Sequence, residues 1–313
     1  MYLNDLLNAH LMSGSHLKTE RFPAFYPSSA SCINNVTNNE VLGSCLRQQY
    51  FRFKGYKESN PSGLYSQWIF AAGNIWEDYL IEQLKQMGLW LANSVKFANN
   101  DLFVSGEIDI LIKGPNYNAE QDTGKWIIEN KTYAGSNYSA KKDICGSRDQ
   151  KPRPKDQNLI QSFIYLCTFG EQVDLVVLNY IDRSCSGPEN NKEFHISLYE
   201  EKGEFFPKIR TTDFFGAEYV YIDRRISYSG IKDRFESLIE YLKKDELPPP
   251  EFQHTYTDEQ VQEKYKLGLI AKTKYEDYCK SPDKKPIGDY QCSNIYCNYS
   301  DLCKVQKNKD GHL

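Results

Sequence analysis

Short apolar runs that alternate with polar positions fill the middle of the chain and predict a set of β-strands. These runs are residues 89–97, 102–113, 125–132, 173–180, 193–199 and 218–222. Successive side chains of a strand point to opposite faces, so alternation indicates a sheet packed against a core. Residues 173–180 are the most apolar run and are expected at the centre of the sheet. The segment between the last two runs is mixed, and no strand is predicted there.

Apolar positions recur at helical spacing in other parts of the chain. The predicted helices are residues 43–53, 64–87, 156–166 and 231–244. In the second of them, apolar side chains three and four apart predict the face that packs on the sheet. That face consists of Ile75, Trp76, Tyr79, Leu80 and Leu84.

Helices combined with a meander of strands predict an α/β protein with a mixed central sheet flanked by helices. The 313 residues suffice for one large domain or two modest ones. We expect an N-terminal arm at 1–25, a core at 26–250 and a cysteine-rich segment at 251–313, with three prolines marking the second boundary. No apolar run is long enough to span a bilayer, and the first residues lack the order of a signal peptide. These features predict a cytoplasmic protein without a membrane partner.

Acidic residues interrupt two of the predicted strands. Asp109 lies inside one apolar run, and Glu129 and Lys131 stand two positions apart in the next. Residues two apart share a face of a strand, and a paired strand can bring Asp109 beside them. Two carboxylates and an ammonium at the end of a hairpin can bind a divalent metal and hold a water next to it. The pattern predicts a hydrolytic site in outline.

Polar residues on two predicted helices are further candidates. Glu77 lies one or two positions from the apolar stripe of its helix, where it can also be an ordinary solvated acid. Gln157, Gln161 and Tyr165 are four apart and therefore share one face of the later helix. Such a stripe can contact phosphate or support a catalytic lysine.

Basic residues gather between positions 141 and 155. Six cations stand against two acids there: Lys141, Lys142, Arg148, Lys151, Arg153 and Lys155 against Asp143 and Asp149. Two prolines forbid a regular helix at the end of this segment. A basic loop suits contact with a phosphate backbone, although a solvated surface loop explains the same pattern. The net charge of −4 argues against a globally basic nucleic-acid binder but leaves room for a local patch.

The chain contains nine cysteines and no export signal, so clustered cysteines favour a metal site over disulfides. Five are scattered before residue 200: Cys32, Cys45, Cys145, Cys167 and Cys185. Four lie near the C-terminus: Cys279, Cys292, Cys297 and Cys303. Taken alone, a cysteine such as Cys45 can equally be a buried core thiol.

The acidic and polar motifs together form an ordered series. In chain order they are Gly73-x-x-x-Glu77, Gly106-x-x-Asp109, Glu129-Asn130-Lys131 and Gln161-x-x-x-Tyr165. The series resembles the PD-(D/E)XK nuclease superfamily, and more closely its RecB-like branch, whose hallmark is the Gln-x-x-x-Tyr helix. Glu77 stands where that branch commonly has histidine. The resemblance covers residues 26–303 and implies a restriction-endonuclease-like fold.

The cysteines extend this resemblance. Cys45 far upstream, with Cys292-x4-Cys297-x5-Cys303, is similar to the cluster ligands of the CRISPR-associated RecB-family exonuclease and of the AddB nuclease domain. There an iron–sulfur cluster joins the N- and C-terminal segments of the nuclease domain. Four thiolates can hold a [4Fe–4S] cluster or a tetrahedral zinc. The family spacing of the last three cysteines is usually x2 and x5, so Cys279 and Cys32 stay open as alternative ligands.

The resemblance implies a Mg²⁺- or Mn²⁺-dependent deoxyribonuclease, most plausibly an exonuclease. The implied metal ligands are Glu77, Asp109, Glu129 and the backbone carbonyl of Asn130, and the other implied catalytic residues are Lys131, Gln161 and Tyr165. The expected partner is DNA, single-stranded or with free ends, with protein partners in recombination, repair, phage replication or CRISPR adaptation. The alternative is a catalytically inactive DNA-binding or adaptor subunit that keeps the fold and the cluster.

Overall fold

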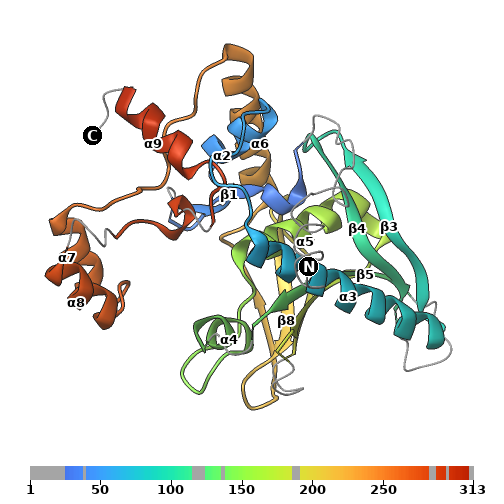
Figure 1. Cartoon of the computed structure of the whole chain (residues 1–313). Coiled ribbons are helices and arrows are strands. Elements are labelled where there is room, and N and C mark those ends of the chain that lie inside the picture. The colour runs from blue at the N-terminus through green and yellow to red at the C-terminus, as the bar shows by residue number, and fades with distance from the viewer. Residues whose placement is uncertain are drawn as a thin grey trace, which may run out of the picture. The chain divides into compact units, whose positions relative to one another are not determined.

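The computed structural model of the chain (Figure 1) describes residues 25–37, 40–114, 124–134, 138–184, 191–281, 287–293 and 296–309. Its contacts divide the chain into two compact units. Unit 1 comprises Met1–Ser44 and Gly63–Glu240, and unit 2 comprises Cys45–Ser62 and Tyr241–Leu313.

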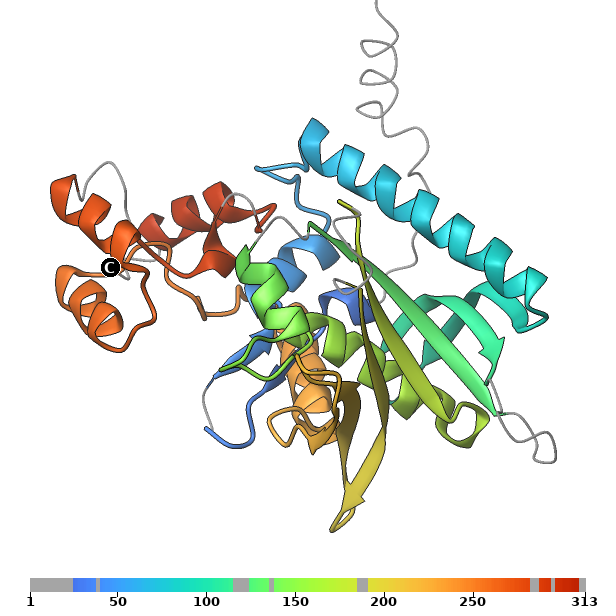
Figure 2. The ribbon, with the colours of Figure 1, turned by 90° about the horizontal axis from the view of Figure 1, so that it is seen from below.

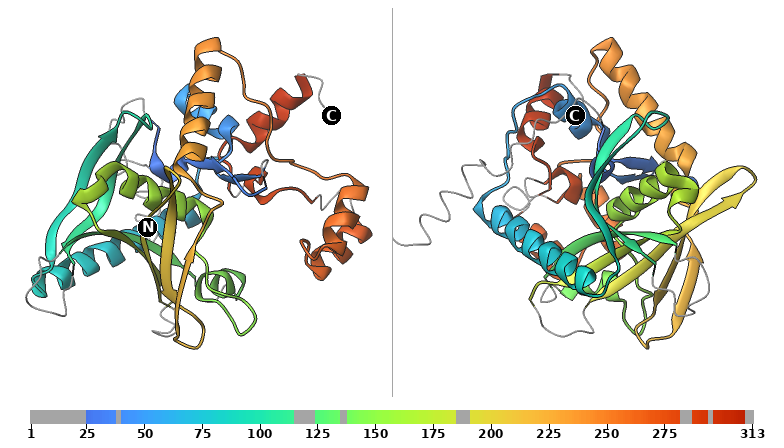
Figure 3. Two further views of the ribbon diagram at one scale, coloured as in Figure 1. Left: turned by 180° about the vertical axis from the view of Figure 1, so that it is seen from behind. Right: turned by 90° about the vertical axis from the view of Figure 1, so that its right-hand side faces the viewer.

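The centre of unit 1 is a seven-stranded sheet whose strands follow one another in chain order. The strands are β3 (Trp90–Asn99), β4 (Val104–Lys113), β5 (Lys125–Tyr133), β6 (Leu175–Asp182), β7 (Lys192–Glu201), β8 (Glu204–Thr212) and β9 (Glu218–Ile222). Neighbours are antiparallel except β5 and β6, which are parallel. A helical connection precedes β6, as a parallel pair requires. Figure 3 shows the strong twist of this sheet from two sides.

Other elements of unit 1 precede, connect and follow the strands of the large sheet. They are η1 (Pro27–Ser29), the two-stranded sheet of β1 (Ser31–Ile33) and β2 (Val41–Gly43), α4 (Tyr138–Cys145), η2 (Gly170–Gln172) and α6 (Tyr228–Lys244). The end of α6, from Tyr241 to Lys244, belongs to unit 2.

Two further helices cover opposite faces of the large sheet (Figure 2). Helix α3 (Leu64–Gln86) packs its end against Ile128 of β5 and the residues around it. Helix α5 (Asp156–Phe169) is buried along most of its length. The side chain of Glu129 interacts with Tyr165 of α5. Because Ile128 and Glu129 are consecutive in β5, their side chains point to opposite faces of the sheet. The helices that contact them, α3 and α5, therefore lie on opposite faces.

The α/β class with a mixed central sheet and flanking helices is confirmed, and one strand of the large sheet was missed. Strand β8 lies in the segment where no strand was predicted. Pro207 obscured it, since proline lacks the backbone N–H that a ladder uses. The alternation is nevertheless present, because Pro207 and Ile209 are buried while Lys208 and Arg210 are exposed.

The buried face predicted for α3 is partly wrong. Ile75 and Tyr79 are 69% and 57% exposed, whereas Ile81 and Leu84 are the buried residues of the helix. Leu80 and Leu84 of the predicted face do pack on the sheet, so the spacing was wrong for Ile75 and Tyr79. Only the second half of the helix contacts the hydrophobic cluster of the sheet, through Ile81 and Leu84.

Unit 2 consists of short helices and connecting segments. The helices are α2 (Leu46–Phe53), α7 (Asp258–Lys266), α8 (Lys272–Lys280), η4 (Tyr290–Cys292) and α9 (Ser300–Lys309). Thr257 and Gln260 form a capping box that begins α7. Tyr265 of α7 stacks on Tyr275 of α8 with ring centroids 3.9 Å apart. Within the described ranges, no helix combines the length and the apolar character needed to cross a membrane.

Candidate functional site

The two acidic strands separate at the predicted site. The register between β4 and β5 runs from Lys113↔Lys125 to Ile110↔Ile128, so Asp109 and Glu129 follow as the next facing pair. There the backbone N–H of Asn130 donates to Asp109 Oδ2 at 3.1 Å. A side-chain carboxylate therefore accepts a hydrogen bond that a regular ladder would direct to a backbone carbonyl.

Glu129 and Lys131 lie on one face of β5, as the alternation predicts. The Lys131 ammonium forms an ion pair with Glu129 Oε1. Glu129 is fully buried, and its other oxygen, Oε2, has no hydrogen-bond partner among the described residues. An unsatisfied buried acceptor costs roughly 1–3 kcal/mol, and more when it is charged. Such a group calls for a ligand, a water or a functional reason.

Helix α5 contributes the two residues of the Gln-x-x-x-Tyr motif. Gln161 Nε2 donates to the Tyr165 hydroxyl at 2.6 Å, so the two share a face as expected. The hydroxyl directs its one proton to the Glu107 carbonyl at 3.4 Å. Burial, followed by the charge of Glu129, raises the pKa of Tyr165 well above its ordinary value. Tyr165 is therefore a neutral donor beside the acids.

The acids influence one another strongly. Burial, followed by the charge of Glu129, raises the pKa of Asp109 to about 8, although Lys131 opposes this. Burial, followed by the same Glu129 charge, also raises the pKa of Glu77. Burial on its own lowers the pKa of Lys131, but Glu129 and Asp109 outweigh it and keep that pKa raised. Glu129 pairs with the Lys131 ammonium, and Asp109 and Glu77 add negative charge nearby, an excess that a cation would relieve.

Glu77 of α3 lies near enough to these residues to be influenced by their charge. Its side chain is half-buried and interacts with Glu129 and Lys131. An ordinary solvated helix acid would show neither feature. One turn earlier, Gly73 lies close to Thr132 of β5, where an added Cβ would be 3.9 Å from Thr132 Oγ1.

Two residues of β6 that the sequence did not single out border the site. Asn179 and Tyr180 pair with Asn130 and Lys131 across the parallel strands. Asn179 Nδ2 donates to Asn130 Oδ1 at 3.1 Å, which turns the Asn130 side chain to the face opposite Glu129. The Asn130 carbonyl is therefore the group that remains for the acid site.

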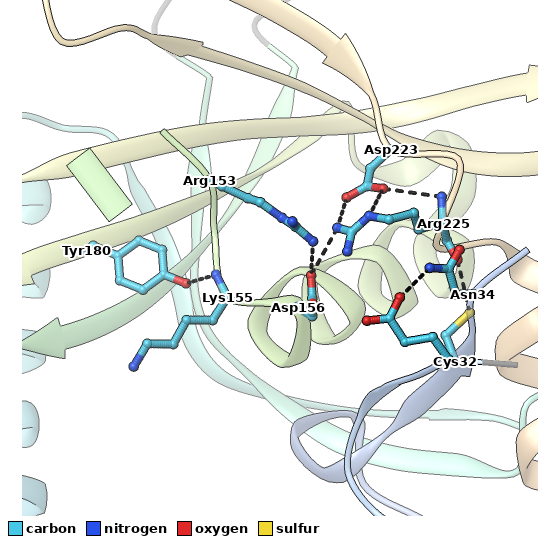
Figure 4. Close-up of polar contacts among 9 residues, drawn as sticks. Cys32, Asn34, Arg153, Lys155, Asp156, Tyr180, Asp223 and Arg225 are labelled. Atoms are coloured by element: carbon cyan, nitrogen blue, oxygen red, sulfur yellow. Dashed lines mark hydrogen bonds and ion pairs between the residues drawn. The ribbon is translucent and has the colours of Figure 1, made fainter. Parts of the chain in front are cut away.

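Tyr180 connects β6 to the first turn of α5. Its hydroxyl accepts the backbone N–H of Lys155 at 3.1 Å, as Figure 4 shows, and Asn158 Nδ2 at 2.8 Å. Burial raises its pKa to about 12, although both hydrogen bonds and Lys131 oppose this. The signal in the sequence is its place at the carboxyl end of a strand. That signal is informative only once β5 and β6 are known to be parallel neighbours.

The basic segment is only partly a loop. Lys141 and Lys142 lie on helix α4, contrary to the loop prediction. Pro152 and Pro154 end regular structure before α5, as predicted. Lys151 pairs with Asp213 at 3.1 Å, so this cation is partly neutralised within the chain.

An ion-pair network at the start of α5 engages another of these cations (Figure 4). Arg153 pairs with Asp156 at 2.8 Å, and Arg225 contacts Asp156 at 3.0 Å and also Asp223. Burial raises the pKa of Asp223 to about 6, although Arg153 opposes this. The network fixes the first turn of the helix that carries Gln161.

The predicted cluster cysteines all belong to unit 2. Cys45 is the N-terminal cap of α2, and burial raises the pKa of its thiol to about 12, although the backbone N–H groups of Arg47 and Gln48 oppose this. Arg47 Nη1 donates to Cys303 Sγ at 3.5 Å. Burial, followed by the other cysteines, raises the pKa of Cys292 to about 12. The backbone N–H of Tyr299 interacts with Cys297.

The alternative cysteine ligands lie elsewhere. Cys32 belongs to unit 1, where its sulfur lies 3.9 Å from the Ser227 carbonyl. Cys279 is exposed and interacts with Tyr275. Cys185 lies outside the described residues.

The side chains are not preassembled as a metal site. Across the described ranges, no three His, Cys, Asp or Glu side chains are placed as ligands of one ion. The donor chemistry nevertheless fits the expected groups. Glu129 Oε2 is an orphaned oxygen of the kind that a hard divalent cation prefers. Four cysteines in one unit fit the thiolate ligands that iron or zinc takes, and the Arg47 guanidinium donates to one of them, Cys303.

A comparison with protein-family models, curated proteins and solved structures finds no match to the chain. A functional assignment therefore depends on the geometry and chemistry of these residues.

Proposed function

We propose that the chain is a Mg²⁺- or Mn²⁺-dependent DNA exonuclease of the RecB-like branch of the PD-(D/E)XK superfamily. One observation carries the proposal: Asp109 and Glu129 face each other where β4 and β5 separate, and the Lys131 ammonium forms an ion pair with Glu129. Glu77 adds a third carboxylate from α3. Acids whose pKa values are raised by burial and by a neighbouring charge mark a candidate functional site.

Glu77, Asp109, Glu129 and the Asn130 carbonyl would hold the metal. A bound Mg²⁺ or Mn²⁺ supplies Lewis acidity, which lowers the pKa of water and neutralises charge on a phosphate. The orphaned Oε2 of Glu129 gains a partner when a cation binds. The raised pKa of Asp109 falls back when positive charge arrives, so the carboxylate is ionised in the loaded site.

Lys131 stabilises negative charge that develops on the phosphate. Its raised pKa keeps the ammonium protonated, and 28% of its side chain is exposed to an incoming strand. The hydrogen bond from Gln161 orients the Tyr165 hydroxyl, which positions the strand beside the acids. Basic residues of the segment 141–155 would contact the backbone of the DNA.

In unit 2, Cys45, Cys292, Cys297 and Cys303 would hold a [4Fe–4S] cluster, or zinc as the alternative. A cluster on these ligands ties the segment Cys45–Ser62 to the C-terminal segment of the same unit. The N–H groups at the start of α2 and the Arg47 guanidinium offset the negative charge of thiolate ligands.

The alternative function is an inactive DNA-binding or adaptor subunit. The two functions predict different outcomes in a cleavage assay.

The test is digestion of end-labelled single- and double-stranded DNA with Mg²⁺ or Mn²⁺. Wild type is compared with Asp109→Ala and Lys131→Ala, and the exposed Asp233→Ala and Lys208→Ala serve as matched controls. We expect cleavage by wild type and controls and none by the two site variants. Activity that survives in the site variants refutes the assignment, and no activity in any protein favours the adaptor.

A further inference from the structure

Unit 1 contains a second candidate site, a cavity of about 980 Å³. Glu77, Asp109 and Glu129 are not among the residues that line it. It opens on the sheet face that carries α3, over β6, β7 and β8. The volume is at the upper end of the range of small-molecule sites, roughly 300–1,000 Å³. A cavity of this size on an uncovered part of a sheet accommodates a ligand larger than an ion.

Aromatic rings form two walls of the cavity. Trp76 and Tyr79 line it from α3, with ring centroids 6.1 Å apart. Phe214 lines it from the turn between β8 and β9. Tyr79 and Phe214 are 57% and 54% exposed, so their faces are available for stacking. Planar heterocycles stack on such rings whatever their sequence or substituents.

The floor is a row of hydrogen-bonding side chains across three strands. Glu193 Oε2 lies 3.2 Å from His195 Nε2, and Arg210 Nη2 lies 3.3 Å from His195 Nδ1. Asn179 continues the row, since it pairs with Glu193 across the strands. The row offers donors and acceptors in one plane of the sheet, which suits the polar edge of a base.

The charged groups of the cavity are not equivalent. The acids Glu193 and Asp213 are engaged by His195 and Lys151, while Glu218 is exposed at the rim. The cation Lys192 is engaged by Thr212. Arg210 and Lys141 also line the cavity, and neither forms an ion pair with a described carboxylate. The fork of N–H donors on a guanidinium is well suited to a phosphate.

We propose that this cavity binds a nucleotide, with the base between the aromatic walls and above the polar row, and the phosphate on Arg210 and Lys141. The site adjoins the acids through the hydrogen bond from Asn179 to Asn130, the residue between Glu129 and Lys131. The nucleotide has two possible sources: a free mononucleotide, or one nucleotide of a DNA strand that extends from the acids. Only the second source depends on the proposed nuclease function.

The experiment measures binding to the full chain in EDTA by isothermal titration, which prevents metal-dependent cleavage. The probes are dAMP, inorganic phosphate and a short single-stranded oligonucleotide. The variants are Trp76→Leu and Arg210→Gln. Matched controls are Trp68→Leu, on the same helix but outside the cavity, and Arg224→Gln, whose partner is Glu201.

We expect dAMP or the oligonucleotide to bind, and Trp76→Leu to weaken binding between about 5-fold and 150-fold, the usual effect of losing one stacking partner. Arg210→Gln weakens it too, while both controls bind as wild type does. Binding of dAMP identifies a free nucleotide as the source, and binding of the oligonucleotide alone identifies the strand.

No binding of either probe overturns the inference, as does equal weakening by the site and control variants. Binding of phosphate alone with the same affinity as dAMP also overturns it, because the base then contributes nothing. A chain that binds nucleotide but never cleaves DNA refutes the nuclease proposal and leaves the cavity assignment intact.

Discussion

Asp109 provides a test of the acid site that does not require catalysis. Replacing Asp109 by Asn removes the ionisable group but keeps an oxygen that can accept the Asn130 N–H. Raising its pKa from 3.8 to about 8 in the folded state corresponds to about 6 kcal/mol at 1.36 kcal/mol per pKa unit. Local relaxation lowers this ceiling, so we expect Asp109→Asn to stabilise the metal-free protein by on the order of 2–3 kcal/mol.

The pH dependence has a definite sign. An acid whose pKa is raised on folding binds its proton more tightly in the folded state, so stability falls as pH rises. For Asp109 the cost is absent below about pH 4, grows between the two pKa values and is complete above about pH 8. The stability gain of Asp109→Asn is therefore larger at pH 8.5 than at pH 5.

Thermal unfolding in EDTA at several pH values measures this effect. A gain of 2–3 kcal/mol corresponds to roughly 4–12 °C in a unit of this size. Addition of Mg²⁺ or Mn²⁺ then stabilises wild type, by about 2.7 kcal/mol at a hundred times Kd, and leaves Asp109→Asn unchanged. The exposed Asp233→Asn is the control. An Asp109→Asn protein that is no more stable than wild type at pH 8.5 refutes the reasoning.

Further predictions concern α3 and the cysteines. Leu84→Ala should lower the free energy of unfolding by about 2–5 kcal/mol, and Ile75→Ala, at a 69% exposed position, by less than about 0.5 kcal/mol in chemical denaturation. Equal losses would contradict the observed orientation of the helix. Cys45→Ser and Cys303→Ser should each abolish bound iron or zinc in elemental analysis of anaerobically purified protein, whereas the exposed Cys279→Ser should retain it. Retention of metal in both site variants would contradict the proposed ligand set.

The part of the candidate site that follows from strand alternation could be predicted from the sequence. Glu129 and Lys131 are two apart in a strand, and a hairpin pairs that strand with the one carrying Asp109. These relations are local, so the structure reproduces them. The contact between Gln161 and Tyr165 is equally local, since one helical turn separates them.

Relations that depend on long-range pairing could not be predicted. Tyr180 borders Lys131 only because β5 and β6 are parallel neighbours, which no spacing in the chain reveals. The orientation of α3 depends on which apolar side meets the sheet, and its sequence is apolar on several sides. Strand β8 was hidden by Pro207, although an alternating burial pattern is preserved around it.

The measurement that tests the central proposal most directly is a time course of end-labelled DNA digestion with Mn²⁺, run on wild type, Glu129→Gln and Lys131→Ala side by side. The Gln variant keeps the shape of the buried side chain and removes the charge that pairs with Lys131. We expect wild type to shorten the labelled strand progressively and both variants to leave it intact, with folding unchanged by circular dichroism. Folded variants that digest the strand at the wild-type rate would contradict the proposal that these residues form a nuclease site.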